Sequence, residues 1–450
     1  MDKLFGTDGI RGRAGEYPIT PEMCIRIGRA IGRKFRQDGH NTRVVIAKDT
    51  RISGDMLEHA IASGVCYSGA DAFLAGVLPT PALAFLIKDM AFDAGVMISA
   101  SHNPFYDNGV KIFRGDGFKL SDEMELALEE FIGEEKESRV SNEAETIGRV
   151  NFVPNSCDRY VDFLAGQINA KKILEGLNVI LDCANGATFE AAPAVFERLG
   201  ADVRSIFTIP DGTNINDGCG SEHTERLVEK VVSRNADVGF AFDGDGDRVI
   251  AVDNKGGRIS GDKLLVFCAK RLKDEGRLAG NMVVSTVMSN IGLSLALKEA
   301  GINHVTTKVG DRHVLREMLT RGACLGGEDS GHMIFLDHHT TGDGILAALK
   351  VSQIIKTSGK AVDEVAGLMK VFPQRLINVE VQVKRPIEDI PEIVAAIERV
   401  EGLLGEKGRV LVRYSGTQPI CRIMVESPTK EETERFSDEI AEVIRKRLGT

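Results

Sequence analysis

The feature that most constrains the fold of this chain is a threefold internal repeat. In each copy an apolar strand is followed by a turn, a helix and a glycine that opens a second strand. These glycines suit the end of a helix, where a left-handed backbone is needed. They are Gly69, Gly200 and Gly301. Strands that alternate with helices form helix-covered sheets, which bind ligands beyond the carboxyl ends of their strands. The repeat therefore predicts three similar α/β domains with mixed, helix-covered sheets around a central cleft.

The pattern changes after about residue 370. Two-residue alternation and β-type composition predict three strands, at residues 378–383, 408–413 and 420–426. Helical periodicity predicts two helices, at residues 390–400 and 430–448. We therefore expect a small C-terminal α+β domain after the three α/β domains. The four expected domains cover residues 1–152, 153–253, 254–368 and 369–450.

Charge and cysteine usage exclude several classes of protein. The chain of 450 residues has 56 Lys and Arg against 66 Asp and Glu, and its net charge of −10 argues against a general nucleic-acid or membrane-surface binder. Its eight cysteines contain no C-x-x-C pair, which argues against a zinc site and a secreted disulfide framework. No apolar run resembles a signal peptide or a membrane span. We therefore expect a soluble, cytoplasmic protein that binds a small molecule.

The loop of the first repeat places a serine where a strand ends. An apolar run at residues 94–98 precedes Ser101, and turn residues follow it in the sequence SHNP. A serine hydroxyl is a weak nucleophile unless a neighbouring group activates it, and His102 and Lys111 are the nearby candidates. The alternative is an ordinary serine in a turn that is stabilised by side-chain hydrogen bonds.

The loop of the second repeat, DGDGDR, offers three carboxylates. Asp243, Asp245 and Asp247 alternate with glycines, so that the backbone can curl and the carboxylates can converge on one hard cation. An EF-hand is excluded because Arg248 replaces its loop glycine and Asn254 its final glutamate. A solvated acidic turn is the other alternative. Mg²⁺ suits the triplet because it accepts a few carboxylates and a phosphate oxygen, which a phosphorylated Ser101 would provide.

The loop of the third repeat, GEDSGH, offers groups that bind hydroxyls. Glu328 and Ser330 are hydrogen-bonding side chains, and His332 either titrates near neutral pH and binds phosphate or is a structural histidine. Three neighbouring segments add candidates. They are residues 308–312, with Lys308, Gly310 and Asp311, residues 340–344, where a helix is expected to start, and the N-terminal loop 6–12, with Arg11.

A tight turn between the last two expected strands has the composition of an anion-binding site. It contains Arg413, Ser415, Gly416 and Thr417, and its backbone N–H groups, hydroxyls and cation form a nest for a phosphate together with Arg422. A plain hairpin turn is the alternative.

In their order and spacing, these four loops resemble those of the α-D-phosphohexomutases, and the resemblance covers essentially the whole chain. Within that superfamily, the motifs GTDGIRG, STVMSN, VGDR, TTGDG and MKVFPQ look like those of the bacterial phosphoglucosamine mutases. Three residues depart from the usual pattern: Asp329 stands in place of Gln, Tyr414 in place of Pro and Gln418 in place of Glu. The additional carboxylate of Asp329 either favours the ammonium group of an amino sugar or faces solvent.

The resemblance implies a reaction and a role for each loop. Ser101 would carry the phosphoryl group that moves between C6 and C1 of glucosamine phosphate, with a hexose 1,6-bisphosphate as intermediate and activator. Mg²⁺ would be held by the three aspartates and the phosphoserine, Glu328 and Ser330 would bind sugar hydroxyls, and the C-terminal loop would bind the phosphate that is not transferred. Such an enzyme supplies precursors of amino-sugar nucleotides and the cell wall.

For the remaining charged residues of the motif loops, charge and position in the sequence suggest roles. Arg248 and Arg11 would neutralise developing charge, Lys111 and His332 would transfer protons, and His102 would orient the phosphoserine. A phosphoglucomutase/phosphomannomutase and a noncatalytic sugar-phosphate sensor are the alternative functions, and a homodimer is a further expectation.

Overall fold

The computed structural model describes residues 4–6, 8–36, 40–133, 147–168, 172–359, 362–415 and 418–449. The chain forms two compact units. The first consists of Met1–Val287 with Asn303–Gly367, and the second of Met288–Ile302 with Leu368–Thr450. The first unit contains three sheets and the second contains one.

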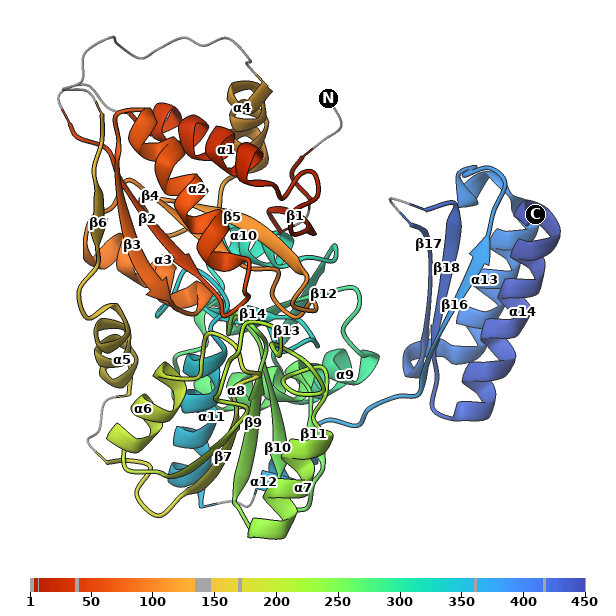
Figure 1. The fold of residues 1–450 in the computed structure, drawn as a ribbon. Coiled ribbons are helices and arrows are strands. Elements are labelled where there is room, and N and C mark those ends of the chain that lie inside the picture. The colour runs from red at the N-terminus through yellow and green to blue at the C-terminus, as the bar shows by residue number, and fades with distance from the viewer. Residues whose placement is uncertain are drawn as a thin grey trace. The chain divides into compact units, whose positions relative to one another are not determined.

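The first sheet has the strand order β1-β5-β4-β2-β3-β6 (Figure 1). Its strands are β1 (Ile10–Arg13), β2 (Arg43–Lys48), β3 (Asp71–Val77), β4 (Ala94–Ile98), β5 (Asp107–Arg114) and β6 (Val150–Phe152). The helices of this part of the chain are α1 (Pro21–Lys34), α2 (Gly54–Tyr67), α3 (Thr80–Asp89), α4 (Asp122–Gly133) and α5 (Ser156–Gly166).

The second sheet has the order β11-β10-β9-β7-β8. Its strands are β7 (Asn178–Asp182), β8 (Asp202–Ile206), β9 (Val238–Phe242), β10 (Val249–Asp253) and β11 (Arg258–Ile259), and its helices are α6 (Ala191–Arg198) and α7 (Glu225–Arg234).

The third sheet has the order β13-β12-β14-β15. Its strands are β12 (Met282–Thr286), β13 (Asn303–Thr307), β14 (Leu325–Gly327) and β15 (Met333–Phe335). The accompanying helices of the first unit are α8 (Gly261–Asp274), α10 (Asp311–Arg321), α11 (Gly344–Ser358) and α12 (Val362–Ala366), with a short 3₁₀ turn at Ala279–Asn281.

The three sheets share a four-stranded core, which confirms the predicted repeat, and β1 and β6 are added to it in the first sheet and β11 in the second. In each core, two parallel neighbours flank the first strand of the copy, and the fourth strand pairs antiparallel with the third. The glycines that end the three repeat helices have the left-handed backbone that was expected, with φ of 90° at Gly69, 93° at Gly200 and 62° at Gly301. The three motif loops therefore occupy equivalent hairpins, β4–β5, β9–β10 and β14–β15.

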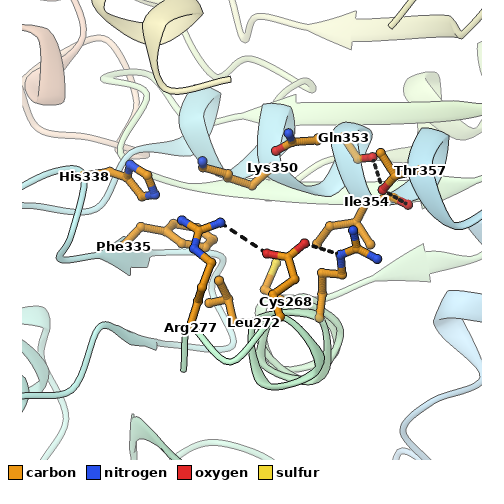
Figure 2. Close-up of a pocket in the computed structure, with 11 residues that line it drawn as sticks. Cys268, Leu272, Arg277, Phe335, His338, Lys350, Gln353, Ile354 and Thr357 are labelled. Atoms are coloured by element: carbon orange, nitrogen blue, oxygen red, sulfur yellow. Dashed lines mark hydrogen bonds and ion pairs between the residues drawn. The ribbon is translucent and has the colours of Figure 1, made fainter. Parts of the chain in front are cut away.

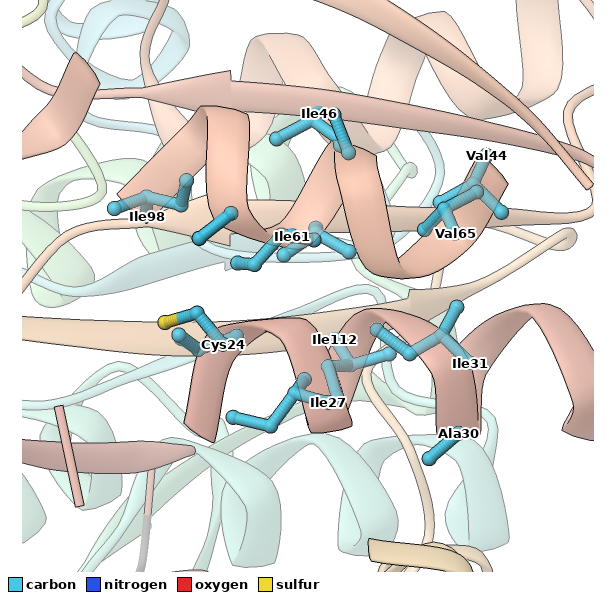
Figure 3. Close-up of a cluster of buried hydrophobic side chains, with 14 of the residues drawn as sticks. Cys24, Ile27, Ala30, Ile31, Val44, Ile46, Ile61, Val65, Ile98 and Ile112 are labelled. Carbon is cyan, nitrogen blue, oxygen red and sulfur yellow. The ribbon is translucent and has the colours of Figure 1, made fainter. Parts of the chain in front are cut away.

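Apolar packing fixes helices on both faces of the first sheet. Val44 and Ile46 of β2 pack with α1 and α2 in one buried cluster (Figure 3), whereas Val45 points to the opposite face, toward α3. Helices α1 and α2 approach closely because Gly28 has no side chain, since a Cβ there would lie 2.2 Å from the carbonyl oxygen of Ile61. The sheet is thus covered as the sequence predicts.

The second unit is an antiparallel three-stranded sheet with helices. It contains α9 (Ile291–Glu299), β16 (Gln374–Glu380), α13 (Pro391–Leu404), β17 (Arg409–Tyr414), β18 (Ile420–Glu426) and α14 (Lys430–Leu448), with 3₁₀ turns at Ile387–Asp389 and Gly405–Lys407. The strand order is β16-β18-β17. Helix α9 joins this unit because the buried carboxylate of Glu426 accepts hydrogen bonds from the side chain of Asn290 and the backbone N–H of Ile291.

One strand of this unit differs from its prediction. The strand expected at residues 378–383 begins earlier, at Gln374, and ends at Glu380. Its partner β18 starts at Ile420, so that the register ends with the pair Glu380 and Ile420. Among the described residues, one further hydrogen bond continues the pairing, from the N–H of Val381 to the carbonyl of Pro419. The length of the partner strand therefore decides where β16 stops.

Among the described residues, no helix is both long enough and apolar enough to cross a membrane.

Candidate active site

The hairpin between β4 and β5 presents Ser101 in an unusual backbone conformation. Its φ is 53°, in the left-handed region that a non-glycine residue rarely adopts. The residue is 2% exposed, and its hydroxyl donates a hydrogen bond of 2.6 Å to Oδ2 of Asp243. Nδ1 of His102 lies 3.4 Å from the same hydroxyl oxygen. The hairpins of the first and second repeats therefore meet at the serine hydroxyl.

The buried side chain of Arg51 binds the backbone of this loop. The side chain of Arg51 has no exposed surface, and its Nε donates to Oδ2 of Asp49 at 2.8 Å. Its two terminal nitrogens donate to four backbone carbonyls of the loop, those of Ser101, Asn103, Pro104 and Asp107. All five N–H groups of the guanidinium are thus used. Arg51 fixes the backbone that carries Ser101.

Asp49 extends this support to the amide of the serine. Its Oδ2 accepts a hydrogen bond of 2.6 Å from the hydroxyl of Ser99, whose oxygen accepts one of 2.9 Å from the backbone N–H of Ser101. The side-chain amide of Asn216 donates to the carbonyl of Ser101 at 2.9 Å. These contacts maintain the left-handed backbone at Ser101.

The resemblance to the phosphohexomutases implies that Ser101 is the reacting group, and small displacements of a reacting group lower rates by about 100-fold. We therefore expect Arg51→Lys to lower kcat by about that factor, because a lysine keeps the charge beside Asp49 but cannot bond four carbonyls. Steady-state kinetics with thermal unfolding would measure this. Arg226→Lys, at an exposed arginine of α7, is the control. A variant that loses stability while keeping the wild-type kcat would contradict a positioning role.

The carboxylates of Asp243, Asp245 and Asp247 converge in the β9–β10 hairpin. All three are buried, and one oxygen of each lies within 4.8 Å of the others. Oδ1 of Asp245 and Oδ1 of Asp247 accept no hydrogen bond within the described part of the chain. Gly244, between Asp243 and Asp245, passes so close to the serine loop that a Cβ would lie 2.5 Å from the carbonyl oxygen of Ser101. Hard anionic oxygens without hydrogen-bond partners fit a divalent cation such as Mg²⁺.

Two lysines balance the negative charge around the triplet. Nζ of the buried Lys111 lies 2.7 Å from Oδ2 of Asp245, 3.1 Å from Oδ2 of Asp8 and 3.5 Å from Oδ2 of Asp247. Lys119 joins Asp8 to Asp311, at 2.5 Å and 2.6 Å. Arg11 also pairs with Asp8, so that the N-terminal loop is tied to the site through one carboxylate.

The electrostatic environment shifts the pKa values of Asp243 and Asp247 in opposite directions. Burial raises the pKa of Asp243 well above its usual value, and the charges of Asp247 and Asp245 raise it further. Burial alone would also raise the pKa of Asp247, but the nearby cations Lys111 and His332 hold it well below its usual value. The pKa of Lys111 is raised because its carboxylate neighbours outweigh its desolvation. The site is therefore strongly polarised.

The third hairpin, between β14 and β15, lies against the second. An isolated β-bridge pairs Arg248 with His332, and Nδ1 of the buried His332 lies 3.6 Å from Oδ1 of Asp247. Nε2 of His332 has no hydrogen-bond partner in the described structure and lies 3.9 Å from Oδ2 of Asp311. Burial lowers the pKa of His332, but Asp247 and Asp311 raise it more, so that the net shift is upward.

The other predicted residues of this region differ in whether their side chains form hydrogen bonds. Oε1 of Glu328 accepts a hydrogen bond of 3.1 Å from the backbone N–H of Gly310. The hydroxyl of Ser330 has no hydrogen-bond partner among the described residues. Lys308 and Asp329 are exposed. Three of the predicted loops are thus brought together in the first unit.

The predicted anion-binding turn lies in the second unit. Arg413 of β17 and Arg422 of β18 are directly opposite each other in the register, and Nε of Arg422 is buried without a hydrogen-bond partner in the described chain. Ser415 is buried, and Nζ of Lys384 donates to its carbonyl at 2.6 Å. Gly416 and Thr417 lie outside the described residues. Three cations therefore surround the start of this turn.

Several side chains that bind the residues of this site were not predicted from the sequence. Asp49 and Arg51 follow β2, the first strand of the first repeat, and charged residues at that strand end were the available signal. Asp8 and Lys119 were missed because only the fold brings them to Lys111 and Asp311. The hydroxyl of Thr80, at the start of α3, donates a hydrogen bond to Oδ2 of Asp245. This contact also could not be predicted from the sequence.

A pocket of about 550 Å³ adjoins the serine loop within the first unit. His102 and Tyr106 line it from the first hairpin, and Asn216, Glu222 and His223 line it from the segment between β8 and α7. Its volume is in the range of small-molecule sites.

Comparison with known proteins agrees with this geometry. Four family models cover the chain: phosphoglucomutase/phosphomannomutase alpha/beta/alpha domains I, II and III at residues 2–139, 158–257 and 260–372, and the C-terminal domain at residues 376–443. The phosphoglucosamine mutase of Syntrophus aciditrophicus (strain SB) is 54% identical over 449 residues, which are 100% of both chains. The chain belongs to the phosphoglucosamine mutases of the phosphoglucomutase/phosphomannomutase family. The predicted resemblance is thereby confirmed.

Solved structures of this family confirm the predicted fold class. A phosphoglucomutase/phosphomannomutase family protein from Burkholderia thailandensis superposes with a TM-score of 0.80 at 24% identity and covers 99% of this chain and 97% of its own. The N-acetylphosphoglucosamine mutase of Aspergillus fumigatus, solved with GlcNAc-6P and magnesium, has a TM-score of 0.67 at 17% identity, with 98% and 95% covered. Like other members of the family, this chain is an intramolecular phosphotransferase of the isomerase class.

Proposed function

We propose that this chain interconverts glucosamine 6-phosphate and glucosamine 1-phosphate by way of a phosphorylated Ser101. The observation that carries the proposal is the buried hydroxyl of Ser101, 2.6 Å from a carboxylate of a triplet that fits a divalent cation. The full-length similarity to phosphoglucosamine mutases supports the choice of sugar.

The reaction consists of two phosphoryl transfers. In the first, the bond between phosphorus and Oγ of phosphorylated Ser101 breaks, a bond forms to the free hydroxyl oxygen of the sugar phosphate, and the hydroxyl proton passes to a base. The resulting bisphosphate reverses its orientation, and its other phosphoryl group returns to Ser101 while the freed sugar oxygen takes up a proton. A hexose 1,6-bisphosphate therefore also activates enzyme that has lost its phosphate.

Charge neutralisation is the main catalytic requirement of phosphoryl transfer. We propose that Asp243, Asp245 and Asp247 hold Mg²⁺ together with the phosphate on Ser101. When bound, the metal offsets the negative charge of the transferring group. Lys111, whose Nζ lies 2.7 Å from Oδ2 of Asp245, supplies a positive charge beside it, and Arg248 and Arg11 supply further charges from the adjoining loops.

Three residues are proposed to handle protons and orientation. His332 is a candidate for proton transfer because its Nε2 is buried and accepts or donates no hydrogen bond within the described structure. Lys111 is the second candidate because its ammonium group lies at the carboxylates. His102 lies 3.4 Å from the serine hydroxyl and is placed to orient the phosphoserine.

Substrate binding is assigned to the third hairpin and to the second unit. Glu328 and Ser330 would bind hydroxyl or ammonium groups of the sugar, with Lys308, Gly310 and Asp311 beside them. In the second unit, the proposed phosphate-binding residues are Arg413, Ser415, Gly416, Thr417 and Arg422. Their support is the paired arginines of the register and the unpartnered Nε of Arg422.

The proposal predicts a preference among sugars. A charge-assisted hydrogen bond contributes about 1.5–3 kcal/mol, and about 1.4 kcal/mol corresponds to tenfold in rate. We therefore expect kcat/KM for glucosamine 6-phosphate to exceed that for glucose 6-phosphate and mannose 6-phosphate at least about tenfold. Assays of the three sugars with added bisphosphate measure it. Equal or faster turnover of glucose 6-phosphate would replace this proposal with a phosphoglucomutase, and no turnover of any sugar would favour a sensor.

We expect the carboxylate of Glu328 to cause the preference for glucosamine 6-phosphate. Glu328→Gln should lower kcat/KM for glucosamine 6-phosphate more than for glucose 6-phosphate, by about tenfold, because only the amino sugar loses a charge partner. The matched control is Asp329→Asn, at the neighbouring exposed position. If Glu328→Gln slows both sugars equally, Glu328 has no part in the discrimination. If Asp329→Asn alone narrows the preference, the ammonium contact belongs to Asp329.

A further inference from the structure

A second pocket lies in the first unit, between α8 and α11, and contains none of the proposed catalytic residues. Its volume is about 70 Å³ (Figure 2). The walls are formed by Cys268, Arg271, Leu272, Glu275 and Arg277 on one side and by Phe335, His338, Lys350, Gln353, Ile354 and Thr357 on the other.

Positive charge predominates in this pocket. Arg271, Arg277 and Lys350 face a single carboxylate, that of Glu275. Glu275 is already shared by the two arginines, since its Oε1 lies 2.5 Å from Nε of Arg271 and its Oε2 lies 3.2 Å from Nη1 of Arg277. Figure 2 shows Lys350 on the opposite wall, reaching toward the side where Arg277 and His338 lie. Both carboxylate oxygens of Glu275 are therefore already bound to the two arginines, and Glu275 forms no ion pair with Lys350.

The ammonium group of Lys350 has only one hydrogen-bond acceptor among the described residues. Its Nζ donates to the carbonyl of Gln167 at 2.9 Å, although an ammonium group has three N–H donors. Burial and the charge of Arg277 lower the pKa of Lys350 to about 8. Burial, Lys350 and Arg277 lower the pKa of His338 to about 4, against the opposing effect of Asp337. The ammonium group of Lys350 therefore lies near the positive charge of Arg277, and among the described residues it forms no ion pair with a carboxylate.

From this geometry we propose that the pocket binds a small tetrahedral oxyanion, either inorganic phosphate or the phosphate group of an ester. The pocket volume of about 70 Å³ leaves room for one small oxyanion. The guanidinium of Arg277 offers the planar pair of donors that phosphate accepts, and Lys350 offers the free N–H groups of its ammonium.

Chemical labelling of Lys350 tests the proposal on the full-length protein. The chain is acetylated at pH 8 in phosphate or in chloride of equal ionic strength, and peptide mass spectrometry gives the rate at each lysine. We expect phosphate to slow labelling of Lys350 at least about fivefold in a saturable way and to leave Lys356, an exposed lysine of the same helix, unchanged. The variant Arg277→Gln should lose the protection. Equal rates for Lys350 in the two salts would overturn the proposal.

A second measurement decides the case in which Lys350 resists labelling in both salts. Phosphate should raise the Tm of the wild type and of Lys356→Met more than that of Lys350→Met, because the proposed catalytic loops of all three proteins bind phosphate alike. Equal shifts in the three proteins would overturn the proposal. Glycerol phosphate identifies the source of the anion: protection by it as well as by phosphate indicates that esters bind, and protection by phosphate alone indicates the free ion.

Discussion

The substitution Ser101→Ala is expected to reduce mutase turnover by at least about 10⁴-fold, because it removes the oxygen that accepts and donates the phosphoryl group. The fold should persist. The backbone of residue 101 is bound by Arg51, Asn216 and Ser99, and none of these contacts uses the hydroxyl of Ser101. Steady-state assays with bisphosphate, together with thermal unfolding, measure both effects.

Intact-mass spectrometry provides the decisive readout for this prediction. Wild-type enzyme incubated with bisphosphate should gain one phosphoryl group, and Ser101→Ala should gain none. Ser63→Ala, at an exposed serine of α2, is the control and should retain both phosphate and activity. Active wild-type protein that never carries phosphate on Ser101 would contradict the proposed intermediate.

The repeated part of the fold could be predicted because local signals and tertiary structure agree in it. Gly69, Gly200 and Gly301 follow their helices with positive φ, and an apolar, largely buried strand precedes each of these helices, at β2, β7 and β12. A parallel sheet buried on both faces needs such strands. The position of each motif loop then follows from topology, since the hairpin after the third strand of every copy occupies the same place in its sheet.

What the sequence could not supply is pairing over long separations. Nothing local indicates that Arg51 bonds four carbonyls more than 49 residues away in the chain, or that Lys111 meets Asp245 across 134 residues. The end of β16 was misplaced for a related reason, because the length of its partner, and not its own composition, terminates it. Motifs identified the chemical groups, and only the fold shows which groups hold them.

Replacing Asp245 of the aspartate triplet by asparagine, which has nearly the same shape, is expected to disturb two contacts. Asp245 accepts hydrogen bonds from Lys111 and Thr80 at Oδ2, while its Oδ1 has no hydrogen-bond partner in the described structure. An asparagine at this position would keep the shape but would remove one of three negative charges, and either orientation of its amide would weaken a contact. An NH₂ group toward Lys111 meets a cation, and an NH₂ group toward the metal position cannot be a ligand.

Asp245→Asn is therefore expected to weaken Mg²⁺ binding at least about 100-fold and to lower turnover at fixed Mg²⁺ by a similar factor, with partial recovery at high metal concentration. Calorimetric titration with Mg²⁺ and assays over a range of metal concentrations measure the two effects separately. The control Asp202→Asn, at an exposed aspartate of β8, should match the wild type. A chelator should abolish wild-type turnover, and added Mg²⁺ should restore it. Undiminished activity of thoroughly chelated wild-type protein would refute the metal assignment, because Lys111 and bound protons would then be sufficient to compensate the charge of the three buried carboxylates.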